Sequence, residues 1–153
     1  MMSAWKMKTK NPLDVIRATL TRKKIKHLGT TSVIAPTAKV FDGENITIGE
    51  DSHINDFVIL SAKGGIIIGD NVHISNHSAI LTEFLDFKIP RKHKYKKITI
   101  GSNVWIASHV VVGAGVTIGR NSVIGASSTV LSNIPANVFA VGSPAKVKRK
   151  LKK

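Results

Sequence analysis

The sequence predicts an all-β fold, a parallel β-helix of about five coils, and two observations carry that prediction. From Ile100 to Val130 an aliphatic residue recurs every six positions, and the residue that follows it is small at most steps. The same six-residue pattern is present upstream, at positions 34, 48, 54, 68, 74 and 80. A period of six fits neither an α-helix nor a simple alternating strand, whereas three such hexads close one coil with three faces.

The coils are expected over residues 30–136, with each hexad supplying a short strand and a tight corner. The aliphatic residue and the residue four positions later point inward, and the small residue lets the backbone pass closely at the corner. Four isoleucines at equivalent positions are then expected to stack along one edge: Ile48, Ile68, Ile100 and Ile118. Their spacing predicts two extra residues near Gly64 and Gly65 and a protruding loop over 86–99.

Two segments flank the coils. Residues 1–29 are a basic segment in which Asn11 and Pro12 suit the N-cap and the first position of a short helix over about 12–26. After the coils the six-residue pattern is broken by three residues: Pro135, Gly142 and Pro144. Residues 137–153 are expected to form a basic tail. The 153 residues therefore make one domain with short appendages.

The net charge of +14 is concentrated in three segments. Residues 1–27 carry +7, residues 86–97 carry +5 and residues 146–153 carry +6, so the rest of the chain carries −4. Only Trp5 and Tyr95 lie in or near these basic runs, whereas nucleic-acid binding usually combines cations with aromatic side chains that stack on bases. We therefore expect anionic small molecules or, weakly, an anionic membrane surface as partners, and no nucleic acid.

The composition excludes further classes of protein. The chain has no cysteine, which excludes a disulfide scaffold, a thiolate metal site and a cysteine nucleophile. Its N-terminus lacks the apolar segment of a signal peptide, and no stretch of about 18 apolar residues is present. We expect a cytoplasmic protein that meets membranes at most peripherally.

The downstream half carries four short motifs in a fixed order. At residues 98–106, 115–119, 123–130 and 142–146 they are ITIGSNVWI, GVTIG, VIGASSTV and GSPAK. Together with hexads of the form aliphatic-Gly-x-x-small-x, they resemble the hexapeptide-repeat acyltransferases, and in particular the galactoside and maltose O-acetyltransferase group, over about residues 30–149. The resemblance implies a left-handed β-helix, a homotrimer, and transfer of acetyl from acetyl-coenzyme A to a saccharide hydroxyl, whether the sugar is free, nucleotide-linked or lipid-linked.

Acyl transfer from a thioester to a hydroxyl needs a base for the hydroxyl proton and donors for the developing oxyanion. Because no Ser-His-Asp arrangement is visible, direct attack in a ternary complex with a histidine base is the simpler scheme. The resemblance places the base of the galactoside-type enzymes at Leu85, and leucine cannot accept a proton. A related subgroup with a similar Leu-Asp pair has a histidine in the loop, twelve residues before the motif tryptophan. That residue is His93 here.

The acceptor side is expected on the coils. His53 and His73 occupy the same hexad position on successive coils, and Trp105 occupies it on the next, so they should form an outward column that lines a groove or a subunit interface. By resemblance, Asn55 falls where the galactoside-type enzymes have a substrate-contacting asparagine, whose amide can donate to an oxyanion or accept from a hydroxyl. Two further residues are expected to contact the acceptor: His77 and Asp86.

The donor side follows from the chemistry of coenzyme A, whose pyrophosphate and 3′-phosphate need cations and backbone donors. By resemblance, Ser108, which follows Trp105-Ile-Ala, meets the thioester end, and Ala126 meets the pantetheine arm. Trp105 is a further expected coenzyme-binding residue. Lys146 and Arg149 match the two basic residues that the family places near the nucleotide phosphates.

Two alternatives remain open from the sequence, and a third is disfavoured. A non-catalytic β-helix scaffold or binding module is compatible with leucine at position 85, and an amino sugar would turn the same site into an N-acetyltransferase. The carbonic anhydrase chemistry known on this fold needs three imidazoles that converge on zinc, and its family has a His-x4-His spacing. His73 and His77 are separated by only three residues, so we expect no metal site.

Overall fold

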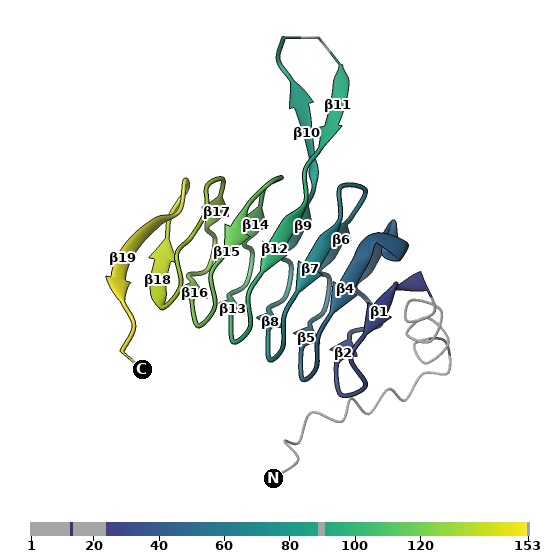
Figure 1. The fold of residues 1–153 in the computed structure, drawn as a ribbon, viewed down its shortest axis with the longest axis horizontal. Coiled ribbons are helices and arrows are strands. Elements are labelled where there is room, and N and C mark those ends of the chain that lie inside the picture. The colour runs from purple at the N-terminus through teal and green to yellow at the C-terminus, as the bar shows by residue number, and fades with distance from the viewer. Residues whose placement is uncertain (1–12, 14–23, 89–90, 153) are drawn as a thin grey trace.

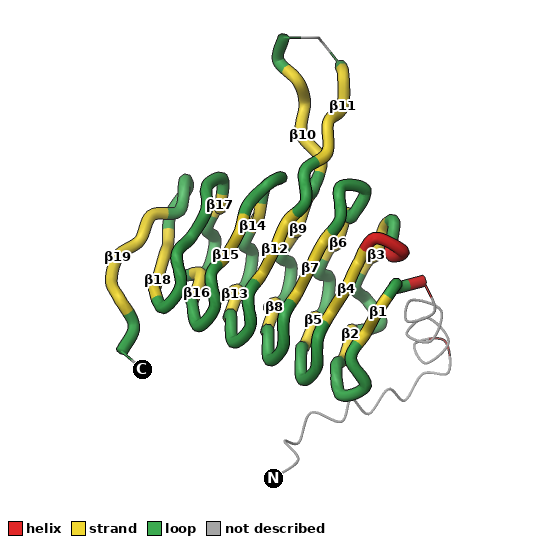
Figure 2. Tube along the Cα trace, in the orientation of Figure 1, coloured by secondary structure: helices red, strands yellow, loops and turns green. Residues whose placement is uncertain are grey.

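The computed structural model describes residues 13, 24–88 and 91–152, and the described chain winds into a three-sided β-helix with one projecting hairpin (Figure 1). Strands and turns follow one another along every coil, and a single 3-10 helix, η1 (Gly43–Asn45), interrupts them in the described ranges (Figure 2). The predicted helix over 12–26 lies almost entirely outside the described residues. The predicted all-β parallel β-helix is confirmed.

Three parallel sheets form the sides of the coils. Sheet A contains β1 (His27–Leu28), β4 (Ile46–Ile48), β7 (Ile66–Ile68), β12 (Ile98–Ile100) and β15 (Thr117–Ile118). Sheet B contains β2 (Val33–Ile34), β5 (His53–Ile54), β8 (His73–Ile74), β13 (Trp105–Ile106), β16 (Val123–Ile124), β18 (Val138–Val141) and β19 (Lys146–Lys150). Sheet C contains β3 (Lys39–Phe41), β6 (Ile59–Ser61), β9 (Ala79–Leu81), β14 (Val111–Val112) and β17 (Thr129–Val130).

The register confirms the predicted stack of isoleucines. In sheet A, Ile48 pairs with Ile68, Ile68 with Ile100, and Ile100 with Ile118. An isolated parallel bridge from Ile118 to Ile134 continues this edge, and β18 continues sheet B, so a partial sixth coil follows the five complete ones.

The core is a column of aliphatic side chains inside the coils. The recurring isoleucines are buried, and so are the valines four positions later, Val104, Val110 and Val116. Each fully buried isoleucine stabilises the fold by about 1.5–3 kcal/mol relative to an exposed one. At the same position on later coils, Ser122 donates to the carbonyl of Pro135 (2.8 Å) and Ser128 to that of Gly125 (2.6 Å), so these buried hydroxyls have partners.

The corners need small or permissive residues. A Cβ on Gly101 would lie 2.7 Å from the backbone nitrogen of Arg120 on the next coil, so a larger residue would push the coils apart. At the corner between sheets A and B, positive φ angles fall on Asp and Asn, which tolerate the left-handed region: Asp51, Asn71, Asn103, Asn121 and Asn137. The four asparagines form a ladder of side-chain amide hydrogen bonds of 2.9–3.0 Å.

The protruding segment is an antiparallel hairpin made of β10 (Glu83–Asp86) and β11 (Lys92–Tyr95). It begins and ends earlier than the predicted loop over 86–99. Glu83 already pairs with Tyr95, whereas residues 98 and 99 belong to β12 and pair with Ile66 and Ile67 of sheet A.

The segment 137–153 differs from a free basic tail within its described part. Val138 and Ala140 are buried and continue the inward pattern of sheet B, because β18 pairs in parallel with β16. The chain then reverses, and β19 pairs antiparallel with β18, so the cations of β19 are fixed on the last strand of sheet B (Figure 1). No helix in the described ranges is long and apolar enough to cross a membrane.

Candidate functional site

The outward column on sheet B has the predicted composition. His53 pairs with His73, and His73 pairs with Trp105. The two imidazoles are stacked, with centroids 4.8 Å apart and planes inclined by 10°. Burial and, secondarily, the charge of His53 lower the pKa of His73, which therefore favours its neutral form.

The indole of Trp105 is anchored to the neighbouring coil. Its Nε1 donates to Oγ of Ser75 at 3.1 Å, yet the residue remains 53% exposed. A large ring that is fixed at one edge and open to solvent on the rest of its surface can form the wall of a groove without losing much conformational entropy on binding.

The same column runs on to the predicted phosphate-binding residues. Trp105 pairs with Val123, Val123 with Phe139, and Phe139 with Arg149 on β19. The Arg149 guanidinium lies 5.9 Å from the centroid of the Phe139 ring, and Lys146 lies opposite Val141 on the same pair of strands. Both cations are exposed. Sheet B thus presents histidines at one end, an indole in the middle and cations at the other end.

The corner between sheets B and C carries the other predicted coil residues. Asn55 follows β5, and Ser75 follows β8 on the next coil. The residues after them, Asp56 and Asn76, each accept a backbone hydrogen bond at their carbonyl from the following coil. Ser108 holds that position after β13, where its carbonyl accepts from Ser127 N at 3.0 Å. The exposed Ala126 follows one coil later.

One residue further, three rings stack along this corner. Phe57 and His77 have centroids 4.9 Å apart, and His77 and His109 have centroids 5.0 Å apart with planes inclined by 4°. All three have positive φ. His77 therefore lies in a corner and borders the column of Asn76 and Ser108.

The hairpin places His93 directly opposite Leu85. The two residues are cross-strand partners. The resemblance places a histidine base at position 85, and here the imidazole lies directly across the hairpin from that position. His93 Nδ1 is hydrogen-bonded to the Glu83 carboxylate, and both side chains are about half exposed. A carboxylate on Nδ1 fixes the ring orientation and leaves Nε2 as the free acceptor.

Asp86 points to the other face of the hairpin. Its carboxylate pairs with Lys94 Nζ at 2.6 Å and accepts from Lys88 N at 3.0 Å. These hydrogen bonds, first of all that from Lys94, lower the pKa of Asp86. Because strand side chains alternate, Asp86 and His93 lie on opposite faces of the hairpin, and the structure does not bring them together.

The hairpin and the sheet B column lie on different sides of the molecule. The hairpin leaves between β9 of sheet C and β12 of sheet A, the corner opposite sheet B in a three-sided coil (Figure 1). A single chain therefore does not bring His93 to Trp105, Ser108 or Arg149.

Two features of the site were missed by sequence reasoning. Glu83 was not singled out, because its contact with His93 depends on the register of the hairpin, which no periodicity reveals. Phe57 and His109 were not linked to His77, although the three share one position on successive coils and that spacing was a usable signal.

Among the described residues, no three His, Asp or Glu side chains gather closely enough to hold a metal ion. The histidines of sheet B and of the corner stack as pairs, with their carboxylate neighbours engaged elsewhere. Asp56, for example, accepts from the Thr37 hydroxyl at 2.6 Å.

Sequence comparison places this arrangement among known enzymes. The family model for bacterial transferase hexapeptide repeats (six repeats) matches residues 97–132. The chain is 38% identical over 144 residues to a galactoside O-acetyltransferase of Escherichia coli (strain K12), covering 88% of this chain and 68% of that protein. It is 36% identical over 125 residues to a putative colanic acid biosynthesis acetyltransferase of the same organism, covering 80% of this chain and 68% of the relative.

Solved structures agree with these relatives. A hexapeptide-repeat-containing acetyltransferase from Vibrio cholerae O1 biovar eltor, complexed with acetyl coenzyme A, superposes with a TM-score of 0.85 at 33% identity, covering 94% of this chain and 81% of that chain. A galactoside acetyltransferase in complex with coenzyme A gives a TM-score of 0.81 at 34% identity, covering 93% and 74%. By these matches, and by the coils and motifs that underlie them, the chain belongs to the hexapeptide-repeat acetyltransferases, a family of enzymes.

Proposed function

We propose that this enzyme transfers an acetyl group from acetyl-coenzyme A to a hydroxyl of a saccharide, with His93 as the general base and Glu83 as the residue that positions it. The observation that carries the proposal is the Glu83–His93 hydrogen bond opposite Leu85. Relatives named as galactoside and colanic acid biosynthesis acetyltransferases support a saccharide acceptor.

The base would act through Nε2. Glu83 accepts the hydrogen bond from Nδ1–H, so the Nε2 lone pair takes the proton of the acceptor hydroxyl as its oxygen attacks the thioester carbonyl carbon. The carbonyl becomes an oxyanion, for which the Asn55 amide is our proposed donor. The C–S bond then breaks, and the departing thiolate of coenzyme A recovers the proton from His93.

The donor would lie along sheet B and its corner with sheet C. Trp105 and Ser108 would border the thioester, Ala126 would leave room for the pantetheine arm, and Lys146 and Arg149 would meet the phosphates. The neighbours complexed with acetyl coenzyme A and coenzyme A support this donor. His53, His73 and His77 would line the acceptor side of the same groove.

Because the hairpin leaves the corner opposite sheet B, we propose that the complete site forms between two copies in a homotrimer. One copy would supply His93 and its neighbour would supply the donor-binding column. The outer face of sheet C supports association, since Ile59, Ala79 and Val111 pair in one outward column and Ile59 and Val111 are each 36% exposed.

The test is turnover, followed as free thiol released from acetyl-coenzyme A across a panel of neutral, acidic and amino sugars. His93→Ala should lower kcat by about 10²–10⁴-fold, the usual contribution of a positioned general base. His77→Ala removes a histidine from the proposed acceptor side and should have a much smaller effect on kcat.

Near-normal turnover of His93→Ala, together with loss in His77→Ala, would show that the base is misassigned. Faster turnover with amino sugars than with hydroxyl acceptors would favour the N-acetyltransferase alternative. Coenzyme binding without turnover on any acceptor would favour a binding module.

A further inference from the structure

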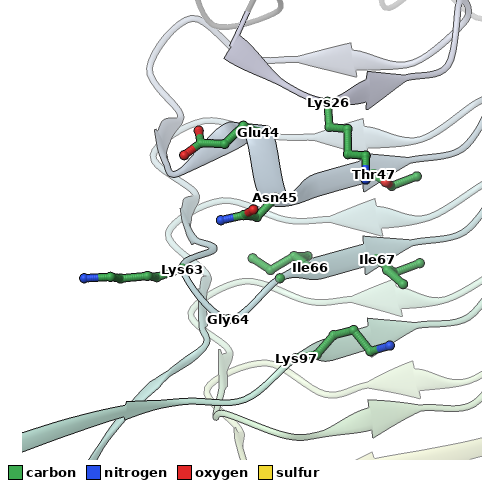
Figure 3. Close-up of a pocket in the computed structure, with 10 residues that line it drawn as sticks. Lys26, Glu44, Asn45, Thr47, Lys63, Gly64, Ile66, Ile67 and Lys97 are labelled. Carbon is green, nitrogen blue, oxygen red and sulfur yellow. The ribbon is translucent and has the colours of Figure 1, made fainter.

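We propose that a groove on sheet A, at the root of the hairpin, binds an acidic saccharide and so makes a carboxylated or phosphorylated glycan the preferred acceptor. The inference rests on the proposed acetyl transfer and adds the class of acceptor. The groove has a volume of about 270 Å³ and lies away from sheet B, between the corner that precedes sheet A and the outer face of that sheet (Figure 3).

Three lysines from different coils line this groove. Lys26 precedes β1, Lys63 lies between β6 and β7, and Lys97 precedes β12. All three are exposed, and none of them is ion-paired within the described part of the chain. Figure 3 shows Lys26 and Lys97 on the side of the groove that holds Thr47 and Ile67, whereas the Lys63 side chain extends away from them. Exposed ammonium groups around one groove attract an anion to it.

The surface between the cations suits a sugar. Figure 3 shows the Lys26 side chain reaching toward Thr47, with Ile67 below it and Lys97 below Ile67. Thr47 pairs with Ile67 in sheet A, and Ile67 is 40% exposed. An apolar patch beside a hydroxyl and the Asn45 amide matches the C–H and O–H groups of a pyranose.

The groove also carries one carboxylate, Glu44, which lies on the same side as Asn45 and Lys63 (Figure 3). The lining therefore has three positive groups and one negative group. A carboxylate accepts hydrogen bonds, and sugar hydroxyls can donate them. The combination favours a ligand with both anionic groups and hydroxyls over a bare inorganic anion.

The length of the groove favours an oligosaccharide. Lys26 and Lys97 flank the run β1-β4-β7-β12, which spans three strand spacings, or about 14 Å. This is the span of the strand backbones, and the Lys26 side chain reaches from its edge toward Thr47 of β4 (Figure 3). A short chain of sugars can follow the groove across these strands and meet both lysines.

The groove leads to the proposed base within one chain. Lys63 Nζ lies 4.8 Å from the centroid of the Tyr95 ring. Tyr95 and His93 are two residues apart on β11 and share the hairpin face that also holds Glu83. An acidic glycan held in the groove could thus extend along this face and present its next hydroxyl to His93 Nε2.

The experiment measures binding by calorimetry to the full chain at fixed low salt. The probes are a trimeric uronic acid oligosaccharide, a phosphorylated oligosaccharide of the same length and the neutral analogue. The double variant Lys26→Ser/Lys97→Ser should bind the acidic probes at least about tenfold more weakly, because two charge-assisted contacts are lost. Lys39→Ser/Lys92→Ser also removes two positive charges, from exposed lysines outside the groove, and is the matched control that should bind as the parent does.

Equal weakening by both changes would indicate net charge alone and overturn the site. So would tight binding of the neutral analogue or the absence of acidic-probe binding in the parent protein. Stronger binding of one acidic probe identifies whether carboxylate or phosphate is recognised. His93→Ala should bind the acidic probe normally but lose turnover. If His93→Ala stays active, the proposed base is wrong, while the binding results still decide the groove.

Discussion

At the scale of single residues, the proposed chemistry depends on one carboxylate. Glu83 is hydrogen-bonded to Nδ1 of His93, which orients the ring and leaves Nε2 for the proposed acceptor. Glu83→Gln keeps the size and one acceptor oxygen but removes the charge that stabilises the imidazolium formed during attack. We expect kcat to fall by about 10–100-fold, within the range of acid–base effects, with KM for acetyl-coenzyme A unchanged.

Lys92→Ala, on the opposite face of β11, is the control for the Glu83 variant and should leave kcat nearly unchanged. Steady-state kinetics on both variants separates the two roles. A rise in KM without a fall in kcat would mean that Glu83 contributes to binding and does not position the base.

A second residue-scale prediction concerns Glu50. Its carboxylate accepts from Thr30 Oγ1 (3.2 Å), Thr31 N (3.0 Å) and Thr31 Oγ1 (2.8 Å). These hydrogen bonds, first of all that from the Thr31 backbone, lower the pKa of Glu50 from 4.5 to about 2. The pKa of Glu50 is lower in the folded protein than in the unfolded chain, so the ionised carboxylate stabilises the fold. This stabilisation is complete above pH 4.5 and is lost as the pH falls through about 2.

Glu50→Gln should therefore unfold more readily than the parent at neutral pH, and the difference should shrink as the pH approaches 2. Denaturant unfolding at a series of pH values measures this directly. A difference that stays constant across that range would assign the effect to packing and not to the charge.

At the scale of elements, regular spacing determines what the sequence can predict. Hexads recur at one period, so partners such as Ile68 and Ile100 can be predicted correctly although they are 32 positions apart in the sequence. The hairpin has no period. Its length follows from the count, but the pairing of Leu85 with His93 depends on tertiary register, and the sequence alone does not specify it.

The end of the chain shows the same limit. Lysines and arginine dominate β19, and strand propensity does not distinguish such a run from a free tail. What makes it a strand is the edge of β18, which needs partners for its backbone groups, so the context and not the composition decides.

The position of β19 on the edge of sheet B leads to a prediction about binding to an anionic membrane surface. Lys146 and Arg149 should serve coenzyme A, whereas Lys150, Lys152 and Lys153 should face an anionic surface at about 1 kcal/mol each. Lys150 of β19 pairs with Val138 of β18, and Leu151 N donates to Asn137 O at 2.8 Å. Substituting the three lysines by serine is therefore cleaner than truncation, which would also remove these contacts.

The triple serine variant should sediment less with phosphatidylserine vesicles at low salt, with KM for acetyl-coenzyme A nearly unchanged. Lys146→Ser/Arg149→Ser should show the converse. Unchanged vesicle binding in the triple variant, or a large rise in its KM for acetyl-coenzyme A, would contradict this division of roles.

At the scale of the whole molecule, the thin β-helix has little interior, so subunit contacts and binding sites both have to lie on its outer faces. The hairpin leaves one corner and the sheet B column proposed to bind the donor occupies the opposite side, so under this proposal a monomer would have two half-sites. In the proposed trimer, the hairpin of each copy would lie beside sheet B of a neighbour. Light scattering should give three times the 16.5 kDa chain mass, and a stable monomer at micromolar concentration would contradict shared sites.

Complementation between two inactive variants tests for a shared site more directly than the mass of the assembly does. His93→Ala lacks the base, and Lys146→Ala/Arg149→Ala lacks the phosphate contacts, so each variant alone should be nearly inactive at low acetyl-coenzyme A. Coexpressed copies that mix at random should pair an intact hairpin with an intact donor column in about a quarter of the interfaces. Recovery of roughly that fraction of parental turnover would locate the site between copies. A coexpressed sample no more active than its parents would place base and donor in the same chain.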